Sequence, residues 1–83
     1  MANHTYESVV ETLKTKLQTE SKITKDLTDA TNVLELGLDS LDVMSYIFYI
    51  EETYDLKIDD DKLEDNNFMI IGETANYILA NLP

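Results

Sequence analysis

The chain has 83 residues, a formal net charge of −11, no cysteine and no arginine. This length allows one domain with a modest core, and we expect a single domain over residues 1–83. Without cysteine, neither a disulfide nor a thiolate metal site can form. The strong negative charge argues against nucleic acid and membrane surfaces as partners.

The first ten residues, MANHTYESVV, contain no basic segment and no apolar run, so no secretory signal is visible. No apolar stretch approaches the length of a membrane span. We expect a cytoplasmic protein and a monomer.

Apolar residues at helical spacing predict a first helix from about Thr5 to Gln18. They form a single stripe: Tyr6, Val9, Val10, Leu13 and Leu17. Residues 19–32 are polar and predict a long loop, with Ile23 and Leu27 as its apolar anchors. Loops of this length are uncommon in small domains and often functional.

The second helix is predicted to start at Asp39 or Ser40 and to end near Tyr54. Aspartate and serine are good N-caps because their side-chain oxygens accept hydrogen bonds from first-turn amides. Asp42 adds negative charge where the helix dipole is positive. Gly37 lets the backbone turn into the helix.

The segment DLKIDDDKLEDNN reads as a loop with a short helix at Asp60–Asp65. A last helix is predicted to open after Gly72, with apolar residues at i, i+3, i+4 and i+7: Ala75, Ile78, Leu79 and Leu82. No strand pattern is visible. The fold class is therefore all-α, a small four-helix bundle with three longer helices and a short third helix.

The second helix carries two apolar stripes when residues are spaced by about 100°. One is a core face: Val43, Tyr46, Ile47, Ile50 and Tyr54. The other stripe consists of Leu41, Met44 and Phe48. Asp39 and Asp42 lie at its N-terminal end, and Glu51 and Glu52 lie beside it. Either the helix is central and buried on both sides, or the second stripe is a docking surface with an acidic rim.

Most of the negative charge lies in residues 35–65, where eleven acids and two lysines give a net charge of −9. Such a segment serves as a solvated face that keeps a protein soluble, or it steers the chain toward basic protein surfaces.

Ser40 lacks the base that a catalytic serine requires. The single histidine is His4, and no lysine lies within ten residues of Ser40. We therefore do not expect an enzyme. Ser40 is either a helix cap or an acceptor modified by another enzyme, and a helix N-terminus is a favourable place for a phosphate group.

The heptapeptide LGLDSLD, Leu36 to Asp42, resembles the prosthetic-group attachment motif of acyl carrier proteins. The similarity extends through LGLDSLDVMSYIFYIEETYDLKI, and FMIIGETANYI is similar to the segment that leads into the family's last helix. It covers the chain from about residue 5 to the end. The resemblance implies the small helix bundle that periodicity also predicts.

By resemblance, Ser40 would receive 4′-phosphopantetheine from coenzyme A through a phosphopantetheinyl transferase. The arm would carry acyl groups as thioesters to acyl-transfer and condensing enzymes with basic docking patches. The family's acidic contacts correspond to Asp39, Asp42, Glu51 and Glu52. Its apolar contacts correspond to Leu41, Met44 and Phe48.

The chain departs from many fatty-acid carriers at Ser45, where they have glutamate, and at Tyr46, Phe48 and Tyr49, where smaller or aliphatic residues are usual. Fatty-acid, polyketide and related lipid pathways therefore stay open. One alternative is an aminoacyl or peptidyl carrier charged by an adenylating enzyme. A second is an unmodified acidic adaptor that docks on basic proteins.

No metal site is predicted. An EF-hand loop counted from Asp59 would need glycine at position six and glutamate at position twelve, but the chain has Glu64 and Ile70 there. Only weak, nonspecific divalent binding at Asp59–Asp61 is expected.

Overall fold

A computed structural model describes residues 4–20 and 23–83 of the chain, and its regular elements in these residues are helical. The connections contain two short 3-10 helices and one isolated backbone bridge, between Asn32 and Ile70. In chain order the elements are α1 (Tyr6–Glu20), η1 (Val33–Glu35), α2 (Ser40–Tyr54), η2 (Asp60–Glu64) and α3 (Ile71–Ala80). The all-α expectation is confirmed, and the short third helix predicted at Asp60–Asp65 is the 3-10 helix η2.

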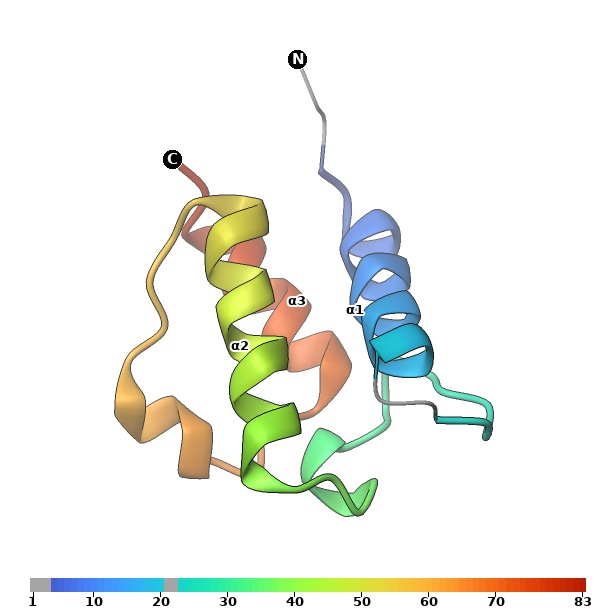
Figure 1. Cartoon of the computed structure of the whole chain (residues 1–83). Coiled ribbons are helices and arrows are strands. Elements are labelled where there is room, and N and C mark those ends of the chain that lie inside the picture. Colours follow the sequence, from blue (N-terminus) through green and yellow to red (C-terminus); the bar gives the residue numbers. More distant parts are fainter. Residues whose placement is uncertain (1–3, 21–22) are drawn as a thin grey trace.

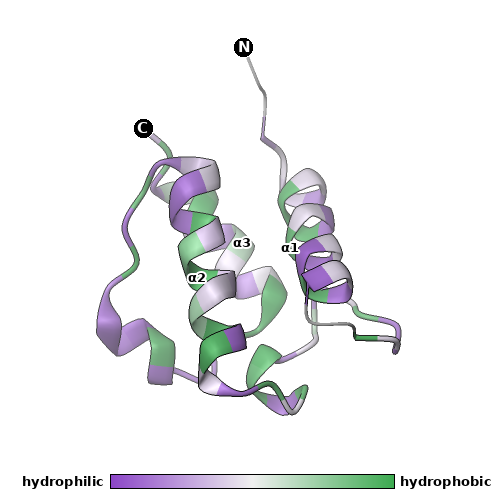
Figure 2. Cartoon of the chain, in the orientation of Figure 1, coloured by the Kyte–Doolittle hydropathy of each residue, from purple (hydrophilic) through white to green (hydrophobic). Residues whose placement is uncertain are grey.

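The three α-helices surround one apolar core. Helix α1 packs against both α2 and α3, and α3 lies behind the other two in Figure 1. The ribbon of α2 is hydrophobic along much of its length, whereas α1 is mostly polar outside its buried stripe (Figure 2). Each α-helix contributes fully buried side chains, among them Leu13, Ile50 and Ile78.

Helix α1 begins one residue later and ends two residues later than predicted. Thr5 lies outside the helix because its hydroxyl oxygen accepts the Ser8 amide at 3.0 Å, while the Ser8 hydroxyl accepts the Thr5 amide at 2.9 Å. This reciprocal pair is a capping arrangement that satisfies two amides at the helix start. At the other end, an ion pair of 3.5 Å between Lys16 and Glu20 lies on the last turn.

Helix α3 begins at Ile71, whereas the sequence predicted a start after Gly72. Its N-cap, Ile70, has no capping side chain. Instead, the Ile71 amide donates to the Thr31 carbonyl at 2.9 Å, and the Gly72 amide donates to the Asp29 carbonyl at 2.8 Å. A distant loop thus satisfies amides that a local cap usually satisfies, so no local sequence signal marked this boundary.

The same helix ends at Ala80, earlier than predicted. Asn81 follows the last helical residue, and its side-chain amide donates to the Tyr77 carbonyl at 2.8 Å. Leu82 therefore lies beyond the helix, although it still packs against the core.

The loop predicted over residues 19–32 is the segment that caps α3. Its residues 19–20 belong to α1, and residues 21–22 lie outside the described part of the chain. Leu27 is buried and Ile23 is half-buried, as expected of anchors. The turn that follows is closed by hydrogen bonds between Thr28 and Thr31, which present the loop carbonyls to α3.

Candidate functional site

Ser40 is the first residue of α2, and its side chain is exposed. The chain reaches it through a turn at Gly37, whose φ of 77° lies in the left-handed region that favours glycine. Asp39 follows in an extended conformation, with φ −82° and ψ 175°, and forms the N-cap. The turn and the cap together place Ser40 at the solvent-facing start of the helix.

The Ser40 hydroxyl is not used to cap the helix. Asp39 does this, since its Oδ1 accepts a hydrogen bond of 2.9 Å from the Asp42 amide. Within residues 4–20 and 23–83, no hydrogen bond holds the Ser40 hydroxyl. The interpretation of Ser40 as a cap is therefore wrong, and its oxygen is available for chemistry supplied from outside.

The histidine lies far from Ser40. The ring of His4 packs edge-on against Tyr54, with ring centroids 5.0 Å apart. Tyr54 is the last residue of α2, fourteen residues after Ser40, which corresponds to about 21 Å along the helix. His4 therefore cannot act as a base for the Ser40 hydroxyl.

The two apolar stripes of α2 lie in different environments. Tyr46, Ile47, Ile50 and Tyr54 of the core face are buried. In the second stripe, Leu41 is 80% exposed, Phe48 is 54% exposed and Met44 is half-buried. We call Leu41, Met44 and Phe48 the α2 strip. The interpretation that α2 is buried on both sides is wrong.

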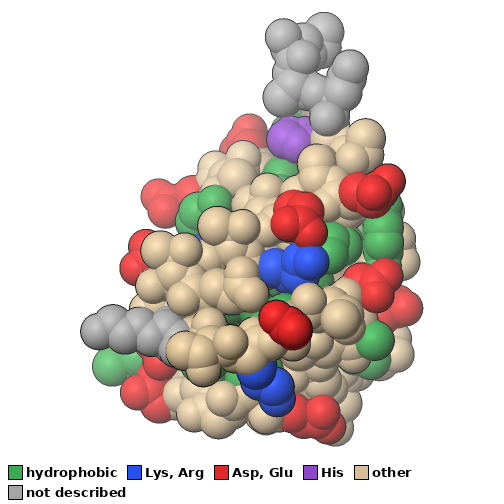
Figure 3. Space-filling view, turned by 90° about the vertical axis from the view of Figure 1, so that its right-hand side faces the viewer, with side chains coloured by type: hydrophobic (Ala, Val, Ile, Leu, Met, Phe, Trp, Pro, Cys, Tyr) green, Lys and Arg blue, Asp and Glu red, His purple; other side chains and the backbone are tan. Residues whose placement is uncertain are grey.

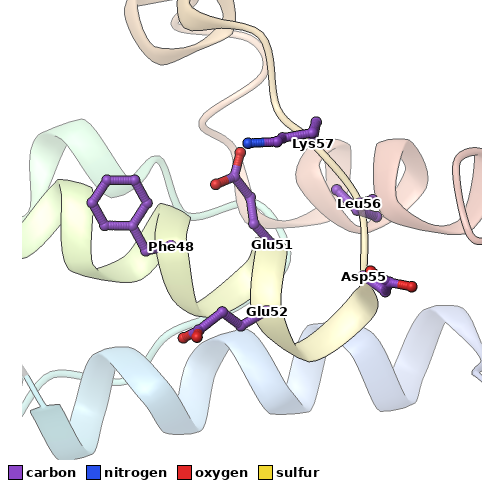
Figure 4. A pocket seen from close by; sticks show the side chains of 6 residues that line it. All are labelled: Phe48, Glu51, Glu52, Asp55, Leu56 and Lys57. Atoms are coloured by element: carbon purple, nitrogen blue, oxygen red, sulfur yellow. The ribbon is translucent and has the colours of Figure 1, made fainter.

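Two surface grooves border the α2 strip. One, of about 370 Å³, lies between α1 and α2 and includes all three strip residues and Lys16. The Lys16 ammonium stands 4.8 Å from the centre of the Tyr49 ring, so a cation–π contact closes this side of the groove. The second groove, of about 720 Å³, continues from Phe48 around the C-terminal end of α2 (Figure 4). Its lining is Phe48, Glu51, Glu52, Asp55, Leu56 and Lys57.

The four acids expected to contact partners have different structural roles. Asp39 caps the helix, and Glu51 Oε2 accepts a hydrogen bond of 2.9 Å from the Ile58 amide, which ties the following loop to α2. Asp42 is half-buried, and Glu52 is exposed. The sequence did not predict that Glu51 holds this loop, because the hydrogen bond depends on how the chain folds back at Ile58, seven residues later.

Acidic side chains also spread over the face that includes α1, where they alternate with lysines (Figure 3). Lys14 pairs with Glu11 at 2.8 Å, and Lys16 pairs with Glu20. Two lysines of α1 are thus partly neutralised by neighbours on the same helix.

Tyr46 and Thr74 bury hydroxyl groups in the core. Thr74 Oγ1 donates to the Phe68 carbonyl at 2.5 Å, whereas Tyr46 Oη has no hydrogen-bond partner in the described part of the chain. Burial raises the pKa of Tyr46 well above its usual value, although the nearby Thr74 hydroxyl offsets part of that rise. Tyr46 therefore stays neutral and fills its place between the helices with a whole phenol ring.

The fold and this site define a small helical protein with an exposed serine at the start of a helix, and comparison with known proteins gives its family. Residues 9–78 match the family described as "Phosphopantetheine attachment site". The chain is 34% identical over 61 residues to an acyl carrier protein of Borreliella burgdorferi strain ZS7, covering 74% of each chain. It is 33% identical over 63 residues to one of Exiguobacterium sibiricum, covering 76% of this chain and 71% of that protein.

The chain therefore belongs to the acyl carrier protein family of phosphopantetheine-binding carriers. It is also 45% identical over 47 residues to the mitochondrial acyl carrier protein of Saccharomyces cerevisiae, a match that spans 57% of this chain and 36% of the yeast protein. Members of this family are carriers rather than enzymes, and their covalent prosthetic group is 4′-phosphopantetheine. Family membership implies that a phosphopantetheinyl transferase and acyl-handling enzymes act on the chain.

The residues present fit this prosthetic group. The Ser40 side chain is exposed and forms no hydrogen bond with the described residues, and it stands at the positive end of the α2 dipole, where a phosphodiester is favoured. The nearest cap carboxylate, that of Asp39, is turned to the Asp42 amide. Attachment at Ser40 would therefore leave the cap of α2 intact.

Among the described residues, no helix has the length and apolar character needed to cross a membrane. The same part of the chain contains no group of three or more histidine, aspartate or glutamate side chains placed to hold a metal ion.

Proposed function

We propose that Ser40 is the attachment residue for 4′-phosphopantetheine and that the chain carries acyl groups as thioesters on this arm. The observation that carries the proposal is the exposed Ser40 hydroxyl at the first position of α2, left free because Asp39 forms the cap. The family match, which includes residue 40, supports the same assignment.

Modification is expected to need an external catalyst, because the single histidine packs at the far end of α2 and no hydrogen bond from the described residues activates the Ser40 hydroxyl. In the transfer, Ser40 Oγ forms a bond to the β-phosphorus of coenzyme A while the bond to the 3′,5′-ADP leaving group breaks. The transferase takes the hydroxyl proton, and the contribution of the chain is to expose the oxygen on a rigid helix end. When bound, the arm supplies the thiol that this cysteine-free chain lacks.

The α2 strip and its acids form the proposed docking surface for partner enzymes. Leu41 and Phe48 provide an exposed apolar centre, and Asp39, Asp42, Glu51 and Glu52 surround it. Apolar centres with polar rims are typical of transient interfaces. Because residues 35–65 have a net charge of −9, partners with basic rims would be steered toward this surface.

An acyl cargo is favoured over an aminoacyl cargo because the relatives compared above are named acyl carrier proteins. Fatty-acid, polyketide and related lipid pathways are all compatible with this proposal. We propose that the chain acts as a single-domain monomer in the cytoplasm, although one relative is mitochondrial.

Intact-mass measurement after incubation with coenzyme A, Mg²⁺ and a broad-specificity transferase tests the attachment. We expect the mass to rise by one phosphopantetheine group in the natural chain and in Ser45→Ala, which removes another exposed serine of α2. Ser40→Ala should stay unmodified. Modification of Ser40→Ala, or none of the natural chain, would refute the assignment.

Loading assays on the modified protein separate the cargo classes. A malonyl or acetyl group transferred by an acyltransferase would support an acyl carrier. Charging by an adenylating enzyme with an amino acid, but with no acyl group, would favour the aminoacyl alternative. A partner that binds the unmodified chain and Ser40→Ala equally, without any modified form in cells, would favour the adaptor.

A further inference from the structure

We propose that the docking surface of this carrier continues from the α2 strip onto Leu56, and that Glu51 is the positioning residue that holds Leu56 there. The inference rests on the proposed function and refines it, because it gives Glu51 an indirect role in docking. The partner is an enzyme that places a long basic side chain in the second groove. Leu56 follows the C-cap of α2 and lines this groove together with Phe48.

Glu51 anchors the chain where it leaves α2. Its backbone carbonyl accepts the amide of the C-cap Asp55 and the amide of Leu56, the latter at 3.2 Å. Such bonds are typical of a helix end at which one residue is left-handed, as Asp55 is with φ 54° and ψ 55°. In addition, the Glu51 carboxylate accepts the Ile58 amide at 2.9 Å. The side chain thus holds the second residue after Leu56.

Contacts from two helices fix this loop. Besides the bond from α2, the Tyr77 hydroxyl of α3 donates to the Lys57 carbonyl at 3.1 Å, and Ile58 is buried in the core. Leu56 is half-buried, so part of its side chain packs against the core and part lines the second groove. Without the Glu51 carboxylate the partly buried Ile58 amide would lose its acceptor, which is unfavourable. Glu51 therefore determines where Leu56 stands.

The two adjacent glutamates of α2 differ in what they offer a partner. The Glu51 side chain points toward Lys57 and the loop, whereas Glu52 points away from them (Figure 4). Glu51 is half-buried and Glu52 is exposed. A partner cation that took the Glu51 carboxylate would have to replace the Ile58 amide. The charge contact with a partner therefore falls to Glu52.

The second groove suits a basic side chain with a long apolar stem. Phe48 and Leu56 provide apolar contacts for the stem, and the exposed acids Glu52 and Asp55 provide contacts for the cationic end. Lysine and arginine pack their stems on apolar surface in this way while their charged ends stay in water. Because Phe48 lines both grooves, a partner docked on the α2 strip also reaches this one.

Paired substitutions at the adjacent glutamates separate the two roles. In Glu51→Gln the side-chain oxygen can still accept the Ile58 amide, whereas Glu51→Ala removes the acceptor. With a broad-specificity transferase and coenzyme A, kcat/KM should fall several-fold in Glu51→Ala and be largely restored in Glu51→Gln. At Glu52 the charge itself matters, so Glu52→Gln should lose about as much as Glu52→Ala. No loss in Glu51→Ala, or an equal loss in Glu51→Gln, would overturn the inference.

Leucine variants show whether Glu51 acts through Leu56. Leu56→Ala should raise the KM of the transferase several-fold with little change in kcat, because binding is lost while Ser40 keeps its position. Adding Glu51→Ala to Leu56→Ala should then have little further effect. Leu63→Ala truncates another half-buried leucine that packs against the core but lines neither groove, so its KM should match the natural chain. Urea denaturation verifies that each variant is folded in the assay. Equal KM values for Leu56→Ala and Leu63→Ala would contradict the role of Leu56.

The Ile58 amide gives a readout that does not depend on modification of Ser40. In ¹⁵N-labelled protein its NMR resonance should shift as acid protonates the Glu51 carboxylate. The shift should persist in Glu52→Gln and disappear in Glu51→Gln. If the shift is the same in Glu51→Gln while Ser40 is modified normally, the inference alone fails. If the natural chain is never modified, the proposed function fails and the inference fails with it.

Discussion

The backbone amide of Gly72 donates to the carbonyl of Asp29 at 2.8 Å, which fixes the loop after α1 against the first turn of α3. The carboxylate of the same Asp29 accepts a hydrogen bond of 2.8 Å from the Tyr6 hydroxyl on α1. One loop residue thus connects both helices. The approach is close enough that only glycine fits without adjustment at position 72.

Gly72→Ala should destabilise the fold by about 1–3 kcal/mol, the usual effect of overpacking. A Cβ at this position would contact the Tyr6 hydroxyl and come within 3.0 Å of the Asp29 carbonyl, a backbone atom that cannot simply rotate away. Urea denaturation of the variant measures the loss. Tyr6→Phe removes the Tyr6–Asp29 bond alone and serves as the control. A Gly72→Ala variant as stable as the natural chain would show that the loop retreats freely.

Tyr46→Phe should stabilise the fold by about 1 kcal/mol. The substitution removes a buried hydroxyl that has no hydrogen-bond partner among the described residues, while the ring that fills the core remains. Thermal and urea unfolding test this. Thr74→Val provides the contrast, because it should destabilise the protein by leaving the buried Phe68 carbonyl without its donor. Loss of stability in Tyr46→Phe would mean that its hydroxyl does have a partner.

Stability should fall as the pH rises above about 10, the usual pKa of tyrosine. Burial raises the pKa of Tyr46 in the folded state, so the unfolded chain loses this proton first and binds fewer protons than the folded chain. The free energy of unfolding then decreases by up to about 1.4 kcal/mol per pH unit for this group. Urea titrations at pH 9, 10 and 11 should give a shallower decline for Tyr46→Phe. Equal slopes for both proteins would contradict the assignment.

We expect Ile50→Ala to destabilise the fold and Leu41→Ala to weaken docking while leaving the fold intact. Ile50 is fully buried, so its truncation should cost roughly 2–5 kcal/mol of stability. Leu41 is 80% exposed, and its truncation should change stability by no more than about 0.5 kcal/mol. We expect Leu41→Ala instead to lower kcat/KM for the transferase through weaker docking. Equal destabilisation by both substitutions would place Leu41 in the core.

The melting temperature should increase from low to moderate salt. Residues 35–65 have a net charge of −9, and their mutual repulsion is screened when the Debye length shrinks to about 10 Å at 0.1 M salt. Calorimetry in NaCl from about 10 to 300 mM measures the change in melting temperature. Over this range the Debye length falls from about 30 Å to below 10 Å. A salt-independent melting temperature would show that the acids are too well solvated to matter.

Periodicity predicted the helices well because each buried stripe repeats within one element. The stripe of α1 and the core face of α2 were both identified from spacing, and Asp39 was recognised as one of two possible caps. The start of α3 was misplaced by contrast, because Thr31 and Asp29, some forty residues earlier, satisfy its first amides.

The sequence alone determined the helical class, the motif around Ser40 and the concentration of acids near it, since these are properties of residue type and local order. The tertiary structure decided which stripe of α2 faces solvent. It also decided that Asp39 rather than Ser40 forms the cap and that Glu51 accepts the Ile58 amide. The physical reason is that spacing defines the faces of a helix, whereas contacts with distant segments decide which face is covered and which polar groups are already bonded.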